Sequence, residues 1–414
     1  APARRGTMGD AEEDTVKTVV RMRPFNKREK TAQATRVVRM EVLQQGSKTY
    51  VTDPDSQEEK DFAYDYSFQS HSADEPGIGT YATQDTVMEQ LGMTVLNKCL
   101  AGKNICLFAY GQTGAGKSFS MLGKLDVPGL EGIVPRVCKE IFAIMGTNED
   151  PNTSYEVDIQ VIEVYCEMIN DLLADRDNWP RRGHKPKLTR TNGYIVQTIK
   201  KPCKCYDDID TAMRFADKNR SVGSHALNPE SSRAHTIYTI HYKKVTKTPG
   251  SNTEETVTAS MNLVDLAGSE RTESAGTTGQ MLKEGNAINL SLTALGGTIK
   301  ALAEGKRARF RDSKLTLMLQ GSMTNGLVIM IAAVSPASIC YPETVSTLRF
   351  ADRVKTVKVK AAANVTVDPV KEIQEQMEKM RAEMQAEIER LRKKAGGGAK
   401  GRDGGLGGGG GAAV

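Results

Sequence analysis

The sequence predicts an α/β fold, in which a central and mostly mixed β-sheet carries helices on both faces. The first observation is an alternation of short apolar runs with helix-like patterns, which is typical of sheets covered by helices. The strand-like runs span residues 15–22, 104–110, 156–165, 236–244, 257–265 and 327–334. The second observation is the stretch Leu107–Leu122, LFAYGQTGAGKSFSML, where an apolar run meets a glycine-rich turn and then a helix-like pattern.

Length and composition limit the classes of protein that fit. The 414 residues are 39% hydrophobic, enough for the core of one large domain or two modest ones. No apolar window is long enough to span a membrane, and no signal-like segment opens the chain. The 7 cysteines are odd in number and scattered, which is typical of reduced thiols in the cytoplasm. The net charge is only +5, so an acidic partner has to meet local basic patches.

Composition also divides the chain into segments. Residues 1–14 are small, polar and charged without periodicity, and we expect them to be disordered. Residues 15–355 have a globular composition and form the main domain. Residues 356–369 show little periodicity and read as a linker, and residues 370–394 lack Gly and Pro and read as a helix. Residues 395–414 are glycine-rich and are expected to be a flexible tail.

The predicted helix at residues 370–394 carries an imperfect heptad pattern. Its apolar a and d positions are Val370, Ile373, Met377, Met380, Met384 and Leu391. Glu387 occupies a d position, and the methionine-rich heptads are too few to dimerise firmly. We therefore expect a weak coiled coil, and a monomer or weak homodimer.

The glycine-rich turn matches the phosphate-binding pattern G-x-x-x-x-G-K-[ST]. Backbone N–H groups of such a loop turn inward around phosphate oxygens, and the following helix adds its dipole. Lys117 is expected to reach the β- and γ-phosphates, and the Ser118 hydroxyl to bind Mg²⁺. An ordinary glycine-rich turn is the alternative, which the flanking strand and helix disfavour. The whole nucleotide-binding loop comprises Gly111, Gln112, Thr113, Gly114, Ala115, Gly116, Lys117 and Ser118.

Two later segments contain candidate partners of a γ-phosphate. In NPESSRAH, Asn228–His235, adjacent hydroxyls beside an arginine can hold Mg²⁺, a phosphate oxygen and an attacking water. In LVDLAGSE, Leu263–Glu270, a strand ends at Asp265, which can bind Mg²⁺ through water. Gly268 then offers an N–H where a γ-phosphate would lie. Taken alone, either segment is also compatible with a simple loop or turn.

The base is predicted from a different part of the chain. GTP-binding P-loop proteins use Asn-Lys-x-Asp, and the nearest match, Asn97-Lys98-Cys99-Leu100, lacks the aspartate. RMRPF, Arg21–Phe25, follows a predicted strand and can place a proline and an arginine against a base. ATP is therefore the expected nucleotide.

These motifs, in this order, resemble the kinesin motor domain. The resemblance covers about residues 15–368 and includes FAYGQTGAGKS, IEVYCEMINDLL, LKEGNAINLSL, RDSKLT and STLRFADRVKTVK. Within the family, YDYSFQSH and NVTVDP are most similar to the kinesin-3 class. The resemblance implies a P-loop NTPase fold of the kinesin type, with residues 356–369 as a neck linker and residues 370–394 as a neck helix.

The resemblance also assigns roles at the nucleotide. Arg21, Arg23 and Pro24 match the adenine-side motif, and Phe119 takes the position that stacks on the base. The catalytic residues implied are Ser231, Arg233, Gly268 and Glu270, and the Mg²⁺ ligands implied are Ser118, Ser232 and, through water, Asp265. The family's Arg–Glu bridge matches Arg233 and Glu270, whose closure orders the water that attacks ATP while the glutamate relays a proton.

Two further surfaces follow from the resemblance. The helix from about Lys283 to Ala303 and the loop after it are expected to bind the microtubule. The basic residues of that loop are Lys306, Arg307, Arg309, Arg311 and Lys314, expected to face acidic tubulin. Asn364 falls where the family places the asparagine that docks the neck linker. A solvated surface and a passive linker are the respective alternatives.

The chain departs from the family pattern at several positions. Leu290 stands where a lysine is common, Leu317 where an arginine is usual, Gly321 where an aspartate is usual, and Ala234 where a serine is usual. Leu290 and Leu317 remove positive charge from the expected filament face. They bear on filament affinity rather than on ATP binding.

Three functions compete at this stage. The leading hypothesis is a microtubule-stimulated ATPase that moves toward the plus end, for organelle or vesicle transport in the cytoplasm, with cargo bound through a tail not in this sequence. The second is a non-stepping microtubule regulator or depolymerase. Depolymerising kinesins resemble one another in a Lys-Val-Asp loop tip and a basic neck before the motor domain. Neither feature is found in this sequence, in which residues 1–14 include four acids. The third is an ATPase acting on nucleic acid, disfavoured by 5% aromatics and no basic–aromatic interleaving.

Overall fold

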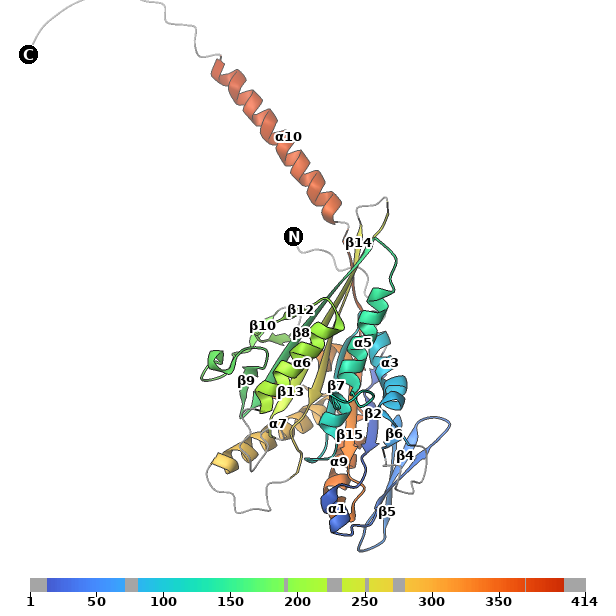
Figure 1. Ribbon diagram of the computed structural model, residues 1–414. Helices are drawn as coiled ribbons and strands as arrows, with labels where there is room; N and C mark the ends of the chain where they lie inside the picture. The colour runs from blue at the N-terminus through green and yellow to red at the C-terminus, as the bar shows by residue number, and fades with distance from the viewer. Residues whose placement is uncertain are drawn as a thin grey trace, which may run out of the picture.

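The computed structural model describes residues 13–70, 81–189, 193–221, 233–249, 253–270, 280–368 and 370–397. Its centre is a mixed sheet flanked by helices (Figure 1), which confirms the predicted fold class. The strands follow the order β12 (Lys201–Cys203), β8 (Thr153–Tyr165), β13 (His235–Lys247), β14 (Glu254–Asp265), β7 (Asn104–Tyr110), β15 (Gly326–Val334), β2 (Lys17–Met22) and β6 (Tyr66–Gln69). Pairing is parallel from β14 through β7, β15 and β2 to β6, and antiparallel among β12, β8, β13 and β14.

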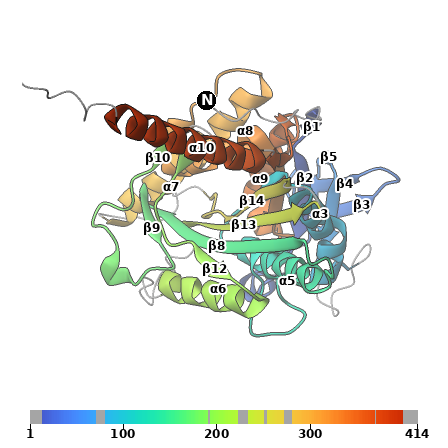
Figure 2. The ribbon, with the colours of Figure 1, turned by 90° about the horizontal axis from the view of Figure 1, so that it is seen from above.

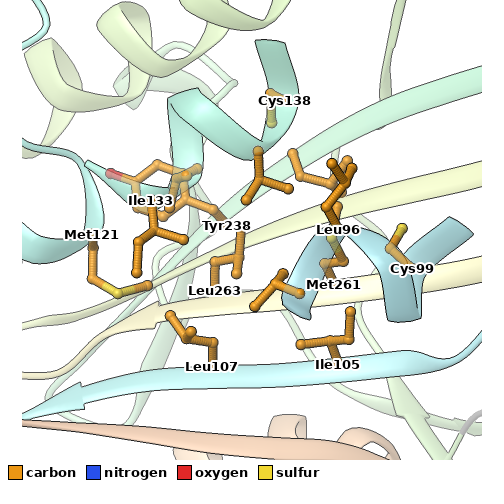
Figure 3. Close-up of a cluster of buried hydrophobic side chains, with 14 of the residues drawn as sticks. Leu96, Cys99, Ile105, Leu107, Met121, Ile133, Cys138, Tyr238, Met261 and Leu263 are labelled. Carbon is orange, nitrogen blue, oxygen red and sulfur yellow. The ribbon is translucent and has the colours of Figure 1, made fainter. Parts of the chain in front are cut away.

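The sheet is buried on both faces because its central strands are apolar throughout. In β7, Ile105 and Leu107 belong to one hydrophobic cluster, and Cys106 and Phe108 belong to another. This alternation is the two-residue period of a strand, applied to a strand covered on both sides. Figure 3 shows the first cluster, where Ile105 and Leu107 meet Met261 and Leu263 of β14 beneath Ile133.

Each cluster is closed by its own set of helices (Figures 1 and 2). The first lies under α3 (Met93–Leu100), α5 (Ile133–Gly146) and α6 (Tyr206–Ser221). The second lies under α7 (Gln280–Ala303), α8 (Lys314–Asn325) and α9 (Tyr341–Val354). Among the described residues, no helix has both the length and the hydropathy needed to cross a membrane.

Five of the six predicted strand runs fall within single observed strands, whereas the run at 15–22 is divided at Val16 between the strands Glu13–Thr15 and Lys17–Met22. Several shorter elements were not predicted. A separate sheet contains β3 (Val38–Val42), β4 (Ser47–Thr52) and β5 (Glu59–Tyr64). The other short elements are α1 (Lys27–Thr31), α2 (Gln84–Val87), the π-turn Met88–Gly92, α4 (Lys117–Met121), β9 (Met168–Asp171), β10 (Lys187–Thr189), β11 (Gly193–Ile195) and the 3₁₀ turns Arg176–Asn178, Phe310–Asp312 and Ser338–Cys340. Many of these short strands are half exposed, so their hydrophobic pattern is weak.

Both ends of the main domain add strands to it. β1 (Glu13–Thr15) pairs antiparallel with β16 (Lys358–Lys360), so the expected disordered segment, residues 1–14, is corrected at its last two residues. Their order comes from a distant partner strand, which local composition does not reveal. β17 (Asn364–Asp368) pairs antiparallel with β14.

The helix α10 (Val370–Gly397) extends the predicted helix by three residues and points away from the sheet in Figure 1. Several of its apolar side chains are exposed, including Met377, Met380, Met384, Ile388 and Leu391. The stripe expected from the heptad pattern is therefore uncovered along the described part of α10. Most of the predicted flexible tail, residues 395–414, lies outside the described residues.

Candidate functional site

The loop between β7 and α4 is shaped by glycines. Gly111, Gly114 and Gly116 have φ values of 148°, 73° and 99°, a region that side chains rarely adopt. At Gly111 a Cβ atom would also lie 2.2 Å from the carbonyl oxygen of Ala333. The glycine spacing seen in the sequence is thus required by the backbone path, which wraps around the start of α4.

Lys117 lies at the centre of this loop. Its Nζ donates hydrogen bonds to the carbonyl oxygens of Gly111 and Gln112, both at 2.9 Å. The residue is 7% exposed, and burial lowers its pKa, against the opposing attraction of Asp265 and Glu270. A buried ammonium group held only by carbonyl dipoles is suited to an added anion such as phosphate.

Asp265 ends β14 directly beside the loop and is fully buried. Its Oδ2 accepts a hydrogen bond from Ser118 Oγ at 2.5 Å. The same oxygen forms a salt bridge with Arg220 Nη1 at 3.1 Å. Its Oδ1 has no hydrogen-bond partner among the described residues. Adjacent hydroxyl and carboxylate oxygens, one of them unpartnered, fit a hydrated Mg²⁺. Ser232, the third predicted ligand, lies outside the described residues, as does Ser231.

Arg220 is a functional residue that the sequence reasoning missed. It comes from the last turn of α6 and is 6% exposed, with its charge against Asp265. Burial opposes the charge on Arg220, but the attraction of Asp265 outweighs it and raises the pKa of Arg220. No local motif marks this arginine, because its partner is 45 residues away in the chain.

The segment after Asp265 is bonded onto the phosphate loop. Ser269 N–H donates to the Gly111 carbonyl at 3.1 Å. The Glu270 carboxylate accepts from Thr113 N–H at 2.7 Å and from Thr113 Oγ at 2.5 Å. Gly268 packs against both partners, because a Cβ atom there would lie 2.2 Å from Thr113 Oγ1 and 2.4 Å from Glu270 Oε2. The structure therefore brings Gly268 and Glu270 to the loop.

Arg233 is half-buried and lies in the turn before β13. The bridge between Arg233 and Glu270 stays a prediction, since the residues before Arg233 lie outside the described part of the chain. The observed partner of Glu270 is the phosphate loop itself, through Thr113.

On the predicted base side, Arg21 is only 4% exposed. It donates to Ser70 Oγ at 3.2 Å, Gln84 Oε1 at 2.9 Å and Ser120 Oγ at 3.2 Å. Its guanidinium lies 5.2 Å from the centre of the Phe119 ring, and burial lowers the pKa of Arg21 to about 10. These contacts make Arg21 a support for Phe119 and α4, the neighbours expected at the base.

Arg23 braces the loop from the same strand end. Its Nε donates to the Gly114 carbonyl at 2.6 Å, and it also donates to the Pro24 carbonyl at 2.7 Å. Both of its terminal nitrogens bind the Glu29 carboxylate at 2.6 Å. Burial alone would disfavour the charged form of Glu29, yet hydrogen bonds from Arg23, Asn26 and Ser335 lower its pKa to about 2. Glu29, another residue missed from the sequence, thus anchors Arg23.

The predicted basic cluster lies after α7. Lys306, Arg307, Arg309 and Arg311 are exposed, and Lys314 is half-buried at the start of α8. Acidic neighbours accompany part of it: Lys306 pairs with Glu304 at 2.7 Å, and Arg309 with Asp312 at 3.2 Å. The cluster therefore offers less net positive charge than its basic residues alone suggest. Leu290, on α7, is 49% exposed.

Asn364 begins β17 at the far end of β14. Its Nδ2 donates to the Gly102 carbonyl at 2.9 Å, Asn104 Oδ1 at 3.2 Å and the Thr258 carbonyl at 3.3 Å. Its backbone N–H also donates to Gly102 at 2.9 Å. One side chain thus ties this strand to both β7 and β14.

Comparison with known proteins places this geometry in context. A family model described as the kinesin motor domain matches residues 21–357. Kinesin-like protein KIF1C of Homo sapiens is 38% identical over 387 residues, covering 90% of this chain and 34% of that protein. Kinesin-like protein unc-104 of Caenorhabditis elegans is 37% identical over 383 residues, covering 89% and 23%. The chain thus spans about a third or less of these relatives.

Solved structures agree with the sequence relatives. A KIF14 dimer with AMP-PNP in complex with a microtubule has a TM-score of 0.74 and 37% identity, and the match covers 84% of this chain and 95% of that one. A structure of a fast kinesin has a TM-score of 0.73 and 33% identity, covering 86% and 95%.

The contact of Gly268 with the loop can be tested without any ligand. Gly268→Ala should force Glu270 off Thr113 and lower the free energy of unfolding by about 1–2 kcal/mol, the usual size of a hydrogen bond to a charged group. Gly297→Ala is the matched control, since a Cβ atom there meets nothing within 4 Å. Thermal unfolding without nucleotide measures both. Equal melting temperatures for the Gly268 variant and the unchanged protein would contradict the assigned contact.

Proposed function

This chain belongs to the kinesin motor-domain family, and we propose that it is an ATP-driven motor that moves along microtubules. The predicted likeness to the kinesin-3 class is confirmed by its curated relatives. One observation carries the proposal: the segment Asp265–Glu270 is bonded to the phosphate loop at two points, through Ser118 Oγ on the Asp265 carboxylate and through Thr113 on the Glu270 carboxylate. These bonds link a phosphate site to the segment that, in P-loop switches, senses the γ-phosphate.

ATP is proposed to occupy the loop with its phosphates on the N–H groups of residues 111–118 and on Lys117. The adenine would lie beside Pro24 and Phe119, which Arg21 and Arg23 hold in place. Ser118, Asp265 and Ser232 would hold Mg²⁺, which, when bound, neutralises charge on the phosphates. Lys117 would exchange its carbonyl partners for phosphate oxygens, which compensates the cost of its burial.

Hydrolysis is proposed to depend on positioning. Gly268 lies against Thr113 and the Glu270 carboxylate, and its N–H would bind the γ-phosphate. Ser231 and Arg233 would complete the arrangement when the two segments close, and Glu270 would take a proton from the attacking water. No side chain attacks phosphorus, so the rate depends on geometry and charge.

Movement is proposed to follow from the surfaces outside the site. The face formed by α7 and the basic loop would bind acidic tubulin, with the charges of Lys306, Arg307, Arg309, Arg311 and Lys314 leading the encounter. The β17 strand would dock on β14 during ATP binding and swing α10 toward the plus end. Transport of organelles or vesicles in the cytoplasm, with cargo bound outside this sequence, is the matching role. The exposed stripe of α10 is consistent with a monomer or a weak homodimer.

A gliding assay on polarity-marked microtubules tests the proposal. The unchanged protein should hydrolyse ATP slowly alone, respond strongly to microtubules, and drive them with their minus ends leading. Lys117→Ala should abolish both activities, because the main charge on the β- and γ-phosphates is lost. Tight binding without gliding would favour the non-stepping regulator, and an ATPase rate that ignores microtubules would refute the motor.

The role of Glu270 in hydrolysis can be separated from its contact with the loop. Glu270→Ala should slow single-turnover hydrolysis by at least ~10²-fold, as expected for loss of an acid–base group. ATP binding should persist, because Glu270 holds neither the base nor the β-phosphate. Thr113→Ala is the comparison, because it removes one of the two hydrogen bonds that hold the Glu270 carboxylate and leaves the carboxylate itself in place. Equal loss in both variants would assign Glu270 to loop structure alone.

The coupling role of Asn364 predicts a split between movement and chemistry. Asn364→Ala removes its side-chain hydrogen bonds and about 1 kcal/mol of docking free energy, enough to shift a balanced equilibrium about fivefold. Gliding velocity should fall more than the microtubule-stimulated ATPase rate. Thr366→Ala, on the same strand with one long bond of 3.5 Å, is the matched control. Equal losses of velocity and ATPase would assign Asn364 to fold stability.

A further inference from the structure

His235, the first residue of β13, is buried between two segments of the proposed switch machinery. It is 2% exposed. Its Nδ1 accepts a hydrogen bond from the backbone N–H of Ala267 at 3.0 Å. Its Nε2 lies 2.7 Å from Ser291 Oγ, in the middle of α7. Ser291 Oγ lies 2.8 Å from the carbonyl oxygen of Ile288.

These contacts determine which atom is the donor in each of the three hydrogen bonds that run from Ala267 through His235 and Ser291 to Ile288. The Ala267 N–H can only donate, so His235 Nδ1 carries no proton and the ring proton is on Nε2. Nε2–H therefore donates to Ser291 Oγ, and the Ser291 hydroxyl donates to the Ile288 carbonyl. Burial, together with the positive charges of Lys117 and Arg220, lowers the pKa of His235 to about 3, in agreement with a neutral ring.

The residues joined in this way belong to segments far apart in the sequence. His235 follows Arg233 by two residues, at the exit of the segment expected to carry Ser231 and Ser232. Ala267 lies between Asp265 and Gly268, so its amide moves with the γ-phosphate side of the site. Ser291 lies on α7, the helix proposed to meet the filament. One imidazole thus contacts both sides of the nucleotide switch and the helix.

We propose that His235 is a positioning residue that couples the nucleotide site to α7 through the chain Ala267–His235–Ser291. The coupling rests on the proposed motor function, since α7 is the filament-facing helix of that function. A displacement of Ala267 when the γ-phosphate arrives or leaves must either carry Ser291 with it or break one of two buried hydrogen bonds. Breaking a buried bond is costly, so the two segments move together.

The same strand provides a matched control. His241 is also on β13, and its Nδ1 lies 3.0 Å from Ser260 Oγ on β14. Both members of this pair belong to the central sheet, away from the phosphate loop. A variant that loses the His241–Ser260 hydrogen bond therefore loses a similar histidine–serine interaction, but its contacts with α7 and Ala267 are unchanged.

The test compares His235→Asn, Ser291→Ala and their double variant with His241→Asn and Ser260→Ala. An Asn at position 235 can still accept from Ala267 but is too short to reach Ser291. Both single variants should lower the ratio of microtubule-stimulated to basal ATPase by about 5- to 10-fold, the usual size of a coupling between sites. The double variant should be no worse than either single one, because both cut the same link. The control variants should keep the ratio of the unchanged protein.

A second measurement works without microtubules. Amide hydrogen exchange along α7 should differ between the ADP state and a non-hydrolysable ATP-analogue state, and His235→Asn or Ser291→Ala should remove most of that difference. Selective ¹⁵N-histidine spectra should show the Nε2–H form of His235 from about pH 5.5 to 8.5, far above its pKa of about 3.

The two measurements separate the proposals. If microtubules fail to stimulate the unchanged protein, the motor function is wrong, and the exchange experiment still decides the coupling. Nucleotide-dependent exchange in α7 that survives both variants would overturn the coupling, as would additive losses in the double variant. Equal losses in the His241 and Ser260 controls would also overturn it, since the effect would then come from general destabilisation.

Discussion

The parallel pairing of β7 with β14 is the constraint on which the rest of the site depends. Its register sets Leu263 opposite Leu107 and Asp265 opposite Ala109. Both strands therefore end at the same edge of the sheet, one at the phosphate loop and the other at the Asp265 carboxylate. The parallel pairs β7–β15 and β15–β2 bring Arg21 to that edge as well, opposite Ala333. This is the general position of ligand sites in open α/β sheets, outside the carboxyl ends of the strands.

The charges collected at this edge are stable only as a set. Three charged side chains at this edge are nearly excluded from water: those of Asp265, Arg220 and Lys117. Burying any one of them without a partner would cost on the order of several kcal/mol. Asp265 offsets the burial of Arg220 directly, at 3.1 Å, whereas Lys117 has carbonyl partners and more distant carboxylates. These three residues therefore carry one uncompensated positive charge, at Lys117, and a bound phosphate would neutralise it. The same argument explains why a binding site of this kind is a place of low local stability until its ligand arrives.

How much of this could be predicted from the sequence depended on whether the signal was local. The strands that lead into the phosphate loop and to Asp265 end where the sequence predicted, because each is a continuous buried run with a defined end. Arg220, Glu29 and the role of His235 were missed, because their partners lie far away in the chain and no local pattern marks them. The expected place of Arg21 on the adenine side stays a prediction, and its hydrogen bonds to Ser70, Gln84 and Ser120 are long-range contacts that no local pattern reveals. The strand at Glu13–Thr15 was hidden for the same reason: its order comes from pairing with Lys358–Lys360.

Contacts along α7 connect the phosphate-loop edge of the sheet with the segment that leads into β17 and α10. A sheet buried on both faces is close-packed and deforms little. A conformational change that starts at the nucleotide site must therefore be carried by the helices packed on the sheet. Ser291 on α7 is joined to the nucleotide edge through His235. Two to three turns further along the same helix, Ile299 and Leu302 line an apolar space with Val16 and Val357.

Val357 directly precedes β16, and its carbonyl accepts the Val16 N–H at 3.0 Å. The pair holds the base of the β1–β16 ribbon, from which the chain continues through β17 into α10. A shift of α7 of the kind proposed for Ser291 would therefore change the packing under Val16 and Val357, where the chain leaves the main domain toward β17 and α10. The helix α7 thus reaches both the Ser291–His235 contact and the apolar space beneath Val16 and Val357.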